Sequence, residues 1–177
     1  MNDGVTFENA VERWLRKRGA RFTEKRVRQR GRVAAHGHEV DVHAIVSNPR
    51  WKLTSQLSIV AAIVGIVVSY ADDTNMVAQT ALLTFAAIMF VLACVMYFGP
   101  RHVWVECKSG DATVRRDVVW KLVNQVEDVR TLQDADWYPS EAWLVARSRF
   151  DVDALSFARH HGVRCFIEQA GDIREVV

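Results

Sequence analysis

The sequence has 177 residues, which gives room for one compact domain and excludes two domains of ordinary size. Half of the residues are apolar, a quarter are charged and the formal net charge is +2, but these averages hide a strong division along the chain. The three cysteines lie in an apolar run and in predicted strands, so they do not indicate a disulfide or zinc framework and fit a reducing compartment. They are Cys94, Cys107 and Cys165.

The first predicted element is an amphipathic helix over residues 6–18, because apolar residues recur there at helical spacing and Gly19 follows as a stop. Residues 26–33 alternate irregularly, and Gly31 indicates a turn within a first hairpin. Residues 39–46 (EVDVHAIV) alternate cleanly and predict a strand. The residues expected on one face of this strand are Val40, Val42 and Ala44.

Two uncharged apolar runs follow, at residues 53–71 and 76–98. Crossing the roughly 30 Å hydrocarbon layer takes about 20 largely apolar residues, so we expect a transmembrane helical hairpin over residues 51–100. Basic residues flank the runs but are lacking in the 72–75 loop, which predicts that both termini are cytoplasmic, at the inner membrane of a prokaryotic cell. Two helices buried in a soluble core are the alternative. Small residues along the runs permit close helix packing and could equally serve a homodimer.

After the apolar runs, the pattern predicts a strand at 102–108, a helix at 114–132, a strand at 142–146, a helix at 153–161 and a strand at 163–168. Residues 1–50 and 101–177 would therefore form one discontinuous α/β domain, large enough for its own core.

Basic residues crowd the N-terminal part of this domain, opposed only by Glu12 and Glu24. Such a cluster suits a polyanion, either nucleic acid or an anionic lipid leaflet, and charge alone does not choose between them. A solvated helix face is the simpler alternative. The cluster consists of Arg13, Arg16, Lys17, Arg18, Arg21, Lys25, Arg26, Arg28, Arg30 and Arg32.

Two strands carry residues suited to metal chemistry. Period two places Glu106 and Lys108 on one face of their strand, with Cys107 directed into the core, and Asp41 lies on the preceding strand. Two carboxylates and an ammonium would then converge on one sheet surface. Divalent cations such as Mg²⁺ prefer oxygen ligands, and phosphodiester cleavage needs a metal to activate water and a cation to stabilise the transition state.

The segments EVDV (39–42) and VECKS (105–109) resemble the strand motifs of the restriction-endonuclease-like, PD-(D/E)XK, superfamily of nucleases. Glu8 looks like the glutamate in the first helix of many members, and Gln125 looks like the glutamine that several branches place after the Glu-x-Lys strand. The C-terminal part is similar to the Mrr-like and archaeal junction-resolvase branches. Val40 replaces the proline of the motif, and the hairpin separates the two catalytic strands.

The resemblance implies an α/β fold with a restriction-endonuclease-like mixed sheet flanked by helices, interrupted here by the two-helix transmembrane hairpin. It also implies a Mg²⁺- or Mn²⁺-dependent nuclease, acting on DNA rather than RNA at the cytoplasmic face. Asp41 and Glu106 would bind the metal, Lys108 would serve the attacking water, and Glu8 and Gln125 would complete the site. The spans must leave and re-enter the domain at neighbouring points.

Each of these residues has a simpler alternative: surface carboxylates for Asp41 and Glu106, an ion-pair partner for Lys108, and a helix N-terminal acid for Glu8. The whole domain could also be a nuclease-like module without activity, used for membrane-tethered binding or assembly. Three histidines could suggest a zinc site, but no Cys or His completes a tetrahedral set at familiar spacing. These histidines are His36, His38 and His43.

Overall fold

The computed structural model describes residues 3–34, 36–48, 50–71, 76–99 and 101–176. The chain divides into two compact units, residues 1–46 with 101–177 and residues 47–100. We call these the α/β unit and the helical unit.

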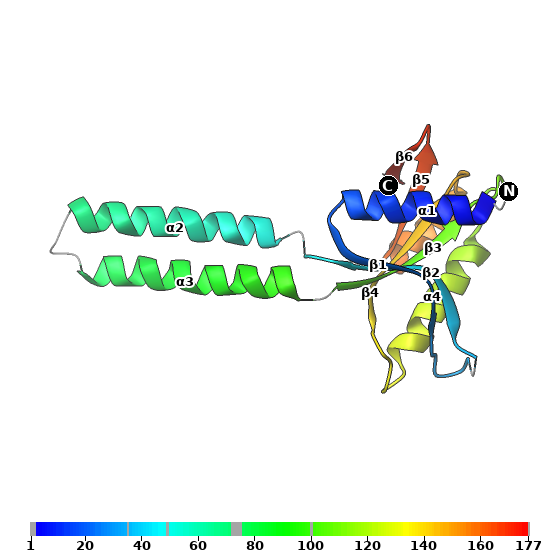
Figure 1. Ribbon diagram of the computed structural model, residues 1–177, viewed down its shortest axis with the longest axis horizontal. Coiled ribbons are helices and arrows are strands. Elements are labelled where there is room, and N and C mark those ends of the chain that lie inside the picture. The colour runs from blue at the N-terminus through cyan, green and yellow to red at the C-terminus, as the bar shows by residue number, and fades with distance from the viewer. Residues whose placement is uncertain (1–2, 35, 49, 72–75, 100, 177) are drawn as a thin grey trace. The chain divides into compact units, whose positions relative to one another are not determined.

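The α/β unit contains one mixed six-stranded sheet, with the strands in the order β1-β2-β3-β4-β5-β6 (Figure 1). The β3–β4 and β4–β5 pairs are parallel, and the other three pairs are antiparallel. A mixed α/β fold is therefore confirmed. The elements are α1 (Asp3–Lys17), β1 (Ala20–Gln29), β2 (His38–Val46), β3 (Arg101–Lys108), α4 (Arg116–Arg130), β4 (Pro139–Ala146), α5 (Val152–His160), β5 (Val163–Gln169) and β6 (Asp172–Val176).

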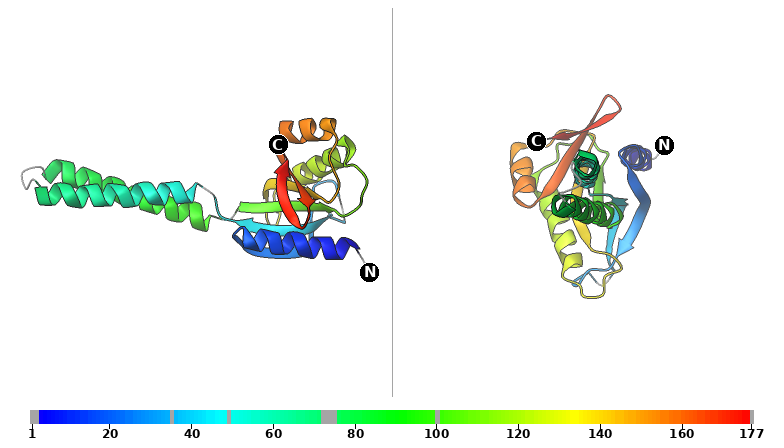
Figure 2. Two further views of the ribbon diagram at one scale, coloured as in Figure 1. Left: turned by 90° about the horizontal axis from the view of Figure 1, so that it is seen from above. Right: turned by 90° about the vertical axis from the view of Figure 1, so that its left-hand side faces the viewer.

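Helices cover both faces of the sheet (Figure 2). Phe7, Val11 and Leu15 of α1 are buried in a core that also contains Val105 and Phe166, which we call the α1-side core. The opposite face is covered by α4 and α5 and forms the α4-side core. Its members include Trp104, Leu122, Val126, Leu144 and Ala154.

The outer strands of the sheet differ most from the sequence expectation. β1 begins at Ala20, well before the irregular segment predicted at 26–33, and β6 was not predicted. Most side chains of β1 are exposed and many are charged, as is common for an edge strand, so they carry little apolar alternation. The β5–β6 turn uses Ala170 and Gly171 at φ of 51° and 82°, where an alanine gives no turn signal.

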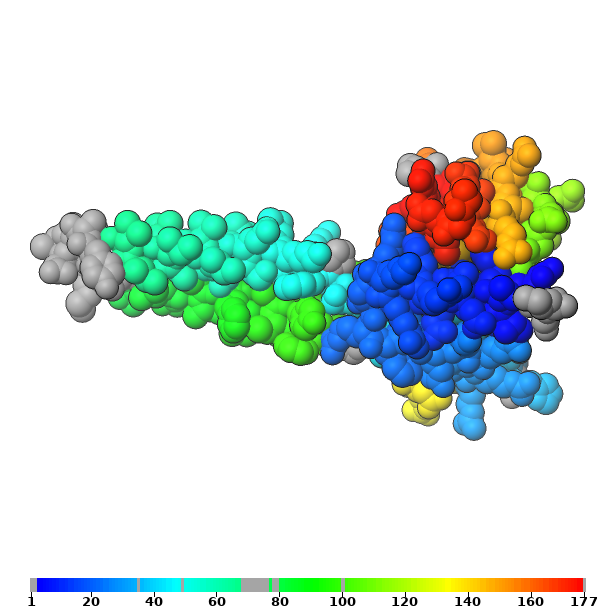
Figure 3. All heavy atoms as spheres, turned by 45° about the horizontal axis from the view of Figure 1, so that its top comes forward, coloured from blue at the N-terminus to red at the C-terminus, as the bar shows by residue number. Residues whose placement is uncertain are grey.

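The end of α1 lies beside this β5–β6 turn (Figure 3). Trp14 and Lys17 of α1 line a hollow together with Asp172 and Ile173 of β6. Trp14 also contacts Phe166 edge to face, with ring centroids 5.1 Å apart. The missed strand β6 therefore extends the surface against which α1 packs.

The pairing of β2 is interrupted at Asp41. In the described strands, neither the pairing with β1 nor that with β3 includes Asp41, although both include Val42. Val40 lies in the α4-side core, whereas Val42 and Ala44 lie in the α1-side core. The prediction that all three share a face is therefore wrong for Val40, because the irregularity at Asp41 breaks the two-residue alternation.

The helical unit consists of α2 (Trp51–Ala71) and α3 (Met76–Phe98), which lie side by side (Figures 1 and 2). Ser58 Oγ of α2 donates to the carbonyl oxygen of Ala86 on α3 over 2.9 Å. A Cβ atom at Gly65 would be 3.3 Å from Leu83, so this glycine permits close packing of the two helices.

Most large apolar side chains described in the helical unit are exposed. Among the described residues, one helical stretch, Thr80–Phe98, is long and apolar enough to cross a membrane, and little of it is buried. The other apolar stretch described, Trp51–Val67, is too short to cross a membrane by the same measure of length. The helix pair thus exists as expected, but its length and composition support one span, and a two-span hairpin stays a prediction.

Candidate active site

The side chain of Asp41 bonds to the neighbouring strand β3. The backbone N–H of Cys107 donates to Asp41 Oδ2 over 2.7 Å. Because Asp41 lies outside both strand ladders, this bond satisfies a strand N–H that the β2–β3 pairing does not reach. The carboxylate of Asp41 is thereby held beside the Glu106–Lys108 segment.

Glu106 and Lys108 form an ion pair on β3, with Lys108 Nζ 2.6 Å from Glu106 Oε1. Cys107 packs against the α1-side core, whereas Trp104 belongs to the α4-side core. By strand alternation Glu106 and Lys108 therefore project to the same side as Trp104, opposite to Cys107. The sequence prediction that these two residues share a face agrees with this ion pair.

The electrostatics of the site are those of crowded carboxylates. Burial, followed by the negative charge of Glu106, raises the pKa of Asp41 to about 6, although the Cys107 N–H and the Lys108 ammonium oppose the rise. Burial also disfavours the ammonium of Lys108, but the charge and hydrogen bond of Glu106 and the charge of Asp41 together raise the pKa of Lys108. A divalent cation between Asp41 and Glu106 would relieve their repulsion.

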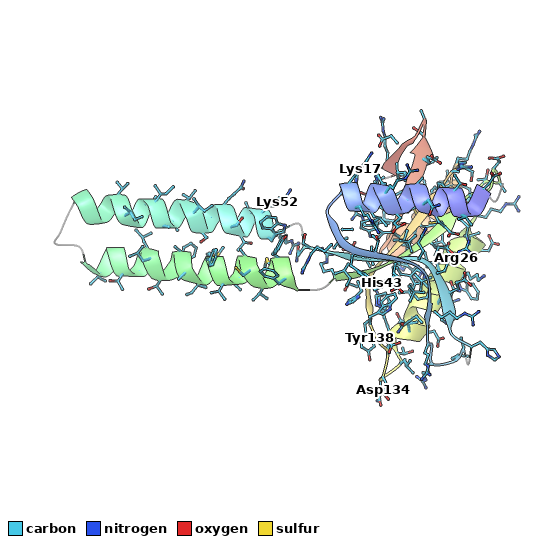
Figure 4. The ribbon with its side chains drawn as sticks, in the orientation of Figure 1. Lys17, Arg26, His43, Lys52, Asp134 and Tyr138 are labelled. Atoms are coloured by element: carbon cyan, nitrogen blue, oxygen red, sulfur yellow. The ribbon has the colours of Figure 1, made fainter. Side chains whose placement is uncertain are left out.

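Glu8 of α1 reaches this cluster through Arg26 of β1, which is labelled in Figure 4. Arg26 Nε and Nη2 donate to the two carboxylate oxygens of Glu8 over 3.1 and 3.4 Å. The hydrogen bond and the charge of Glu8, with smaller contributions from Glu39 and Asp41, raise the pKa of Arg26. Glu8 is therefore within electrostatic reach of Asp41, and its role in the site stays a prediction.

The unusual backbone conformation of Arg26 was not predicted from the sequence. Its φ is 53°, a left-handed conformation that is unfavourable for a residue with a Cβ by about 1–2 kcal/mol. Arg26 and Asp41, which would face each other, are both absent from the β1–β2 register pairs of the described strands, although the pairs on either side are in register. Strained backbone of this kind gathers at functional sites. No glycine or asparagine marks the position, and Arg26 looked like one more member of a basic run.

Gln125 is not joined to the cluster. In the described part of the chain, no hydrogen bond or ion pair links Gln125 with Asp41, Glu106 or Lys108. Gln125 instead lines an open hollow on α4 together with Trp120. Its predicted place in the active site therefore rests on the family resemblance alone.

His38 and His43, two of the three histidines that could suggest a zinc site, contact different partners. His38 Nε2 lies 2.8 Å from Asp128 Oδ2, whereas His43 lies 2.9 Å from His102 and stacks on Trp137 with a centroid distance of 4.0 Å. Burial, and to a lesser extent His102, lowers the pKa of His43 to about 4. This stack could not be foreseen because Trp137 is distant in sequence.

No group of three or more His, Cys, Asp or Glu side chains arranged to hold a metal ion is found among the described residues. The acidic donors that fit a hard divalent cation are the pair Asp41 and Glu106, whose charges already influence one another. Two carboxylates suffice for a cation such as Mg²⁺, which keeps several waters and takes further oxygen ligands from a phosphate.

No family model matches the sequence, and no curated protein matches it. One solved structure is similar in fold: the crystal structure of AF1548, a protein of unknown function, with a TM-score of 0.53 and 13% sequence identity. The similarity covers 93% of this chain, and the chain spans 57% of the length of AF1548. At this level of identity the similarity indicates the fold alone.

Proposed function

We propose that this chain is a Mg²⁺- or Mn²⁺-dependent nuclease that hydrolyses phosphodiester bonds, of DNA rather than RNA. The observation that carries the proposal is the position of Asp41, which the Cys107 N–H holds beside the Glu106–Lys108 ion pair; the raised pKa of Asp41 agrees with this crowding. Perturbed titratable groups that are drawn together in this way mark functional sites more often than ordinary surface. The resemblance to PD-(D/E)XK nucleases rests on the same residues.

In this proposal Asp41 and Glu106 would hold the ion, which supplies an activated water and neutralises charge on the phosphate. Lys108 orients the attacking water and stabilises the negative charge that develops at the phosphate oxygens. Its Nζ is 2.6 Å from Glu106, so the ammonium stands at the edge of the carboxylate that binds the ion. Arg26 is held by Glu8 through Nε and Nη2, so only the N–H groups of its guanidinium that these bonds leave unused can be offered to a phosphate.

Part of the basic run is already neutralised within the protein. Arg16 and Lys25 pair with Glu12 at 2.8 and 3.5 Å, and Arg26 pairs with Glu8. By contrast, the arginines at the end of β1 and in the following turn are exposed and make no ion pair in the described part of the chain. We assign phosphate binding to this group, and we call it the turn arginines. They are Arg28, Arg30 and Arg32.

We further propose that α2 and α3 anchor the protein in the inner membrane, with both termini in the cytoplasm. Support comes from the exposed apolar surface of both helices and from the span-length stretch Thr80–Phe98. Trp51 and Tyr97 contact each other edge to face, with centroids 4.9 Å apart, at the helix ends where aromatic rings favour the lipid interface.

Cysteine labelling in intact cells tests this topology. In a chain freed of its native cysteines, a cysteine at Thr74, which lies outside the described residues, should react with an impermeant reagent. A cysteine at Ser109 should react only after the cells are opened. Labelling of Ser109 in intact cells, with Thr74 protected, would reverse the topology. Recovery of the protein in the soluble fraction would reject the anchor.

An inactive, membrane-tethered binding module is the second candidate function. The observation in its favour is that Glu106 and Glu8 are already paired with Lys108 and Arg26, so two acidic groups near the site are balanced without a metal ion. A homodimer through the helical unit stays a prediction in either case. Small residues such as Gly65 do not support it, because they already serve the packing of α2 on α3 within one chain.

Cleavage assays on the detergent-purified chain separate the two functions. Linear, supercoiled, single-stranded and branched DNA, and RNA, are incubated with Mg²⁺, Mn²⁺ or EDTA. We expect divalent-ion-dependent cleavage that Lys108→Ala lowers by about a hundredfold or more, since loss of one transition-state donor has that effect. Arg174→Ala, an exposed cation on β6, is the matched control. Cleavage that is equal in the Lys108→Ala and parent proteins would reject the assigned site.

A further inference from the structure

We infer that the hollow on α4 beside the β1–β2 turn binds an unpaired nucleic-acid base by stacking it on Trp120. This inference rests on the proposed function, since it names the form of nucleic acid that the site takes: single strands, or duplex with a base turned out. It also gives a role to Gln125, which no hydrogen bond or ion pair in the described part of the chain joins to Asp41, Glu106 or Lys108.

The hollow has a volume of about 560 Å³ and is open to solvent. Its walls come from α4 and from the turn between β1 and β2, with predominantly apolar surface and a few polar groups, as is usual for a small-ligand site. The residues used here are Val33, His38, Trp120, Lys121, Asn124 and Gln125.

Trp120 is the dominant feature of this hollow. It is 57% exposed on α4, although its neighbours Val119 and Leu122 are fully buried in the α4-side core. Val33, across the hollow, is 85% exposed. A large aromatic surface left in water on a helix face marks a binding site when other groups gather around it. A nucleobase offers an aromatic ring that can cover the indole.

Polar groups lie where the edge of a stacked base would need them. Asn124 and Gln125 follow Trp120 by about one helical turn, so all three line the same hollow. An amide side chain offers both a donor and an acceptor to a base edge, which in a paired duplex is already engaged. Lys121 adds a cation at the rim for a phosphate.

The wall formed by the turn is held in place by Asp128. Its carboxylate accepts hydrogen bonds from the backbone N–H of Val33 over 2.8 Å and of Ala34 over 3.4 Å, and it lies 2.8 Å from His38 Nε2. The backbone N–H of Arg32 donates to the Asp128 carbonyl oxygen. The hollow is therefore preformed, which reduces the entropy lost on binding.

The charge around the hollow selects a nucleic acid as the occupant. Arg30 and Arg32 stand on the same β1–β2 turn that forms one wall, Arg28 lies at the end of β1, and all three are exposed. His38, in the wall, is three residues from Asp41 along β2, a separation of roughly 10 Å. A strand whose phosphate lies at the metal site can therefore place the base of a nearby nucleotide on Trp120.

The test measures binding without cleavage, so that it does not depend on the nuclease activity. The full-length protein in detergent, with EDTA, is titrated with labelled oligo(dT) and with a labelled duplex of equal length. We expect Trp120→Ala to weaken oligo(dT) binding by at least about fivefold, the lower limit for one base–aromatic stack. Duplex affinity should change less than twofold. Trp120→Phe should keep most of the affinity, and Tyr138→Ala, an exposed aromatic outside the hollow, should behave like the parent.

The outcomes separate this inference from the proposed function. Weakened oligo(dT) binding in Trp120→Ala supports stacking even if no divalent ion yields cleavage, a result that would reject the nuclease alone. Unchanged oligo(dT) affinity in Trp120→Ala overturns the stacking inference, whether or not the protein cleaves DNA. A loss confined to binding of phosphatidylserine in mixed micelles would also overturn it, because the hollow would then face lipid.

Discussion

The Cys107 backbone N–H donates to Asp41 Oδ2 over 2.7 Å, and this bond joins the two strands that carry the proposed metal ligands. It holds the Asp41 carboxylate at a point where the regular ladder between β2 and β3 does not include it. The side chain of Asp41 thus takes the place of a backbone acceptor, and β3 fixes the position of the Asp41 carboxylate through this bond.

The raised pKa of Asp41 predicts a pH dependence of stability. Between its unperturbed value of 3.8 and about 6, the folded state binds more protons than the unfolded state, so ionisation of Asp41 lowers the free energy of unfolding as pH rises. In EDTA, the free energy of unfolding of Asp41→Asn, measured relative to that of the parent, should therefore rise by on the order of 2 to 3 kcal/mol between pH 4 and pH 7. Urea unfolding at several pH values measures this difference, and parallel curves for the two proteins would contradict it.

Metal binding should distinguish the carboxylates from the ammonium. Asp41→Asn and Glu106→Gln each keep the side-chain shape but remove a charge from the ligand oxygens, so Mn²⁺ affinity should fall by about tenfold or more. Lys108→Met should keep or increase that affinity, because a neighbouring cation is removed. Calorimetric titration with Mn²⁺ measures all three. A lower affinity in Lys108→Met than in Glu106→Gln would show that Lys108 was given the wrong role.

The backbone of Arg26 predicts an unusual order of stabilities. Arg26→Ala and Arg26→Gly both remove the ion pair to Glu8, but only glycine accepts a φ of 53° without strain. Arg26→Gly should therefore be more stable than Arg26→Ala by about 1 kcal/mol, the reverse of the usual order in a strand. Thermal unfolding of the two variants gives the comparison. As a control on the same strand, Arg28→Ala should be more stable than Arg28→Gly.

Gly31 should tolerate no side chain. A Cβ atom there would collide with the Asp128 carboxylate and with His38 Nε2, which lies 2.8 Å from the ideal Cβ position. Gly31→Ala would break the contacts by which Asp128 holds the turn, with a loss of about 1–3 kcal/mol. Gly110→Ala, with no heavy atom near the added Cβ, is the control. Equal unfolding midpoints for the two variants would contradict the described turn.

The parts of the site that could be predicted from the sequence are those governed by local alternation. Glu106 and Lys108 were expected on one face, opposite Cys107, because β3 is regular and its neighbours are apolar. Val40 was misplaced because the alternation in β2 fails at Asp41, which in the described strands is missing from the register with β1 and lies beyond the last residue of β2 that pairs with β3. Strand irregularities of this kind depend on long-range contacts and leave no local pattern.

Contacts between distant segments account for the other omissions. Arg26 meets Glu8, and His38 meets Asp128, across sequence separations that periodicity does not register. β6 is a short hairpin partner whose turn begins with Ala170, a residue that normally avoids a positive φ. Gln125 was assigned to the catalytic group from resemblance, and that role stays a prediction; in the structure Gln125 lines the hollow with Trp120.

The insertion between β2 and β3 has a consequence for how the protein folds. Val46 and Arg101 are register partners although residues 47–100 separate them. If this segment were a flexible loop, the entropy lost on closing it would grow with its length and would oppose the strand pairing. Because α2 and α3 associate along their lengths, their pairing brings both ends of the segment back together. Pairing of α2 with α3 therefore lowers the entropic cost of joining β2 to β3, and with it the cost of assembling the Asp41–Glu106 site.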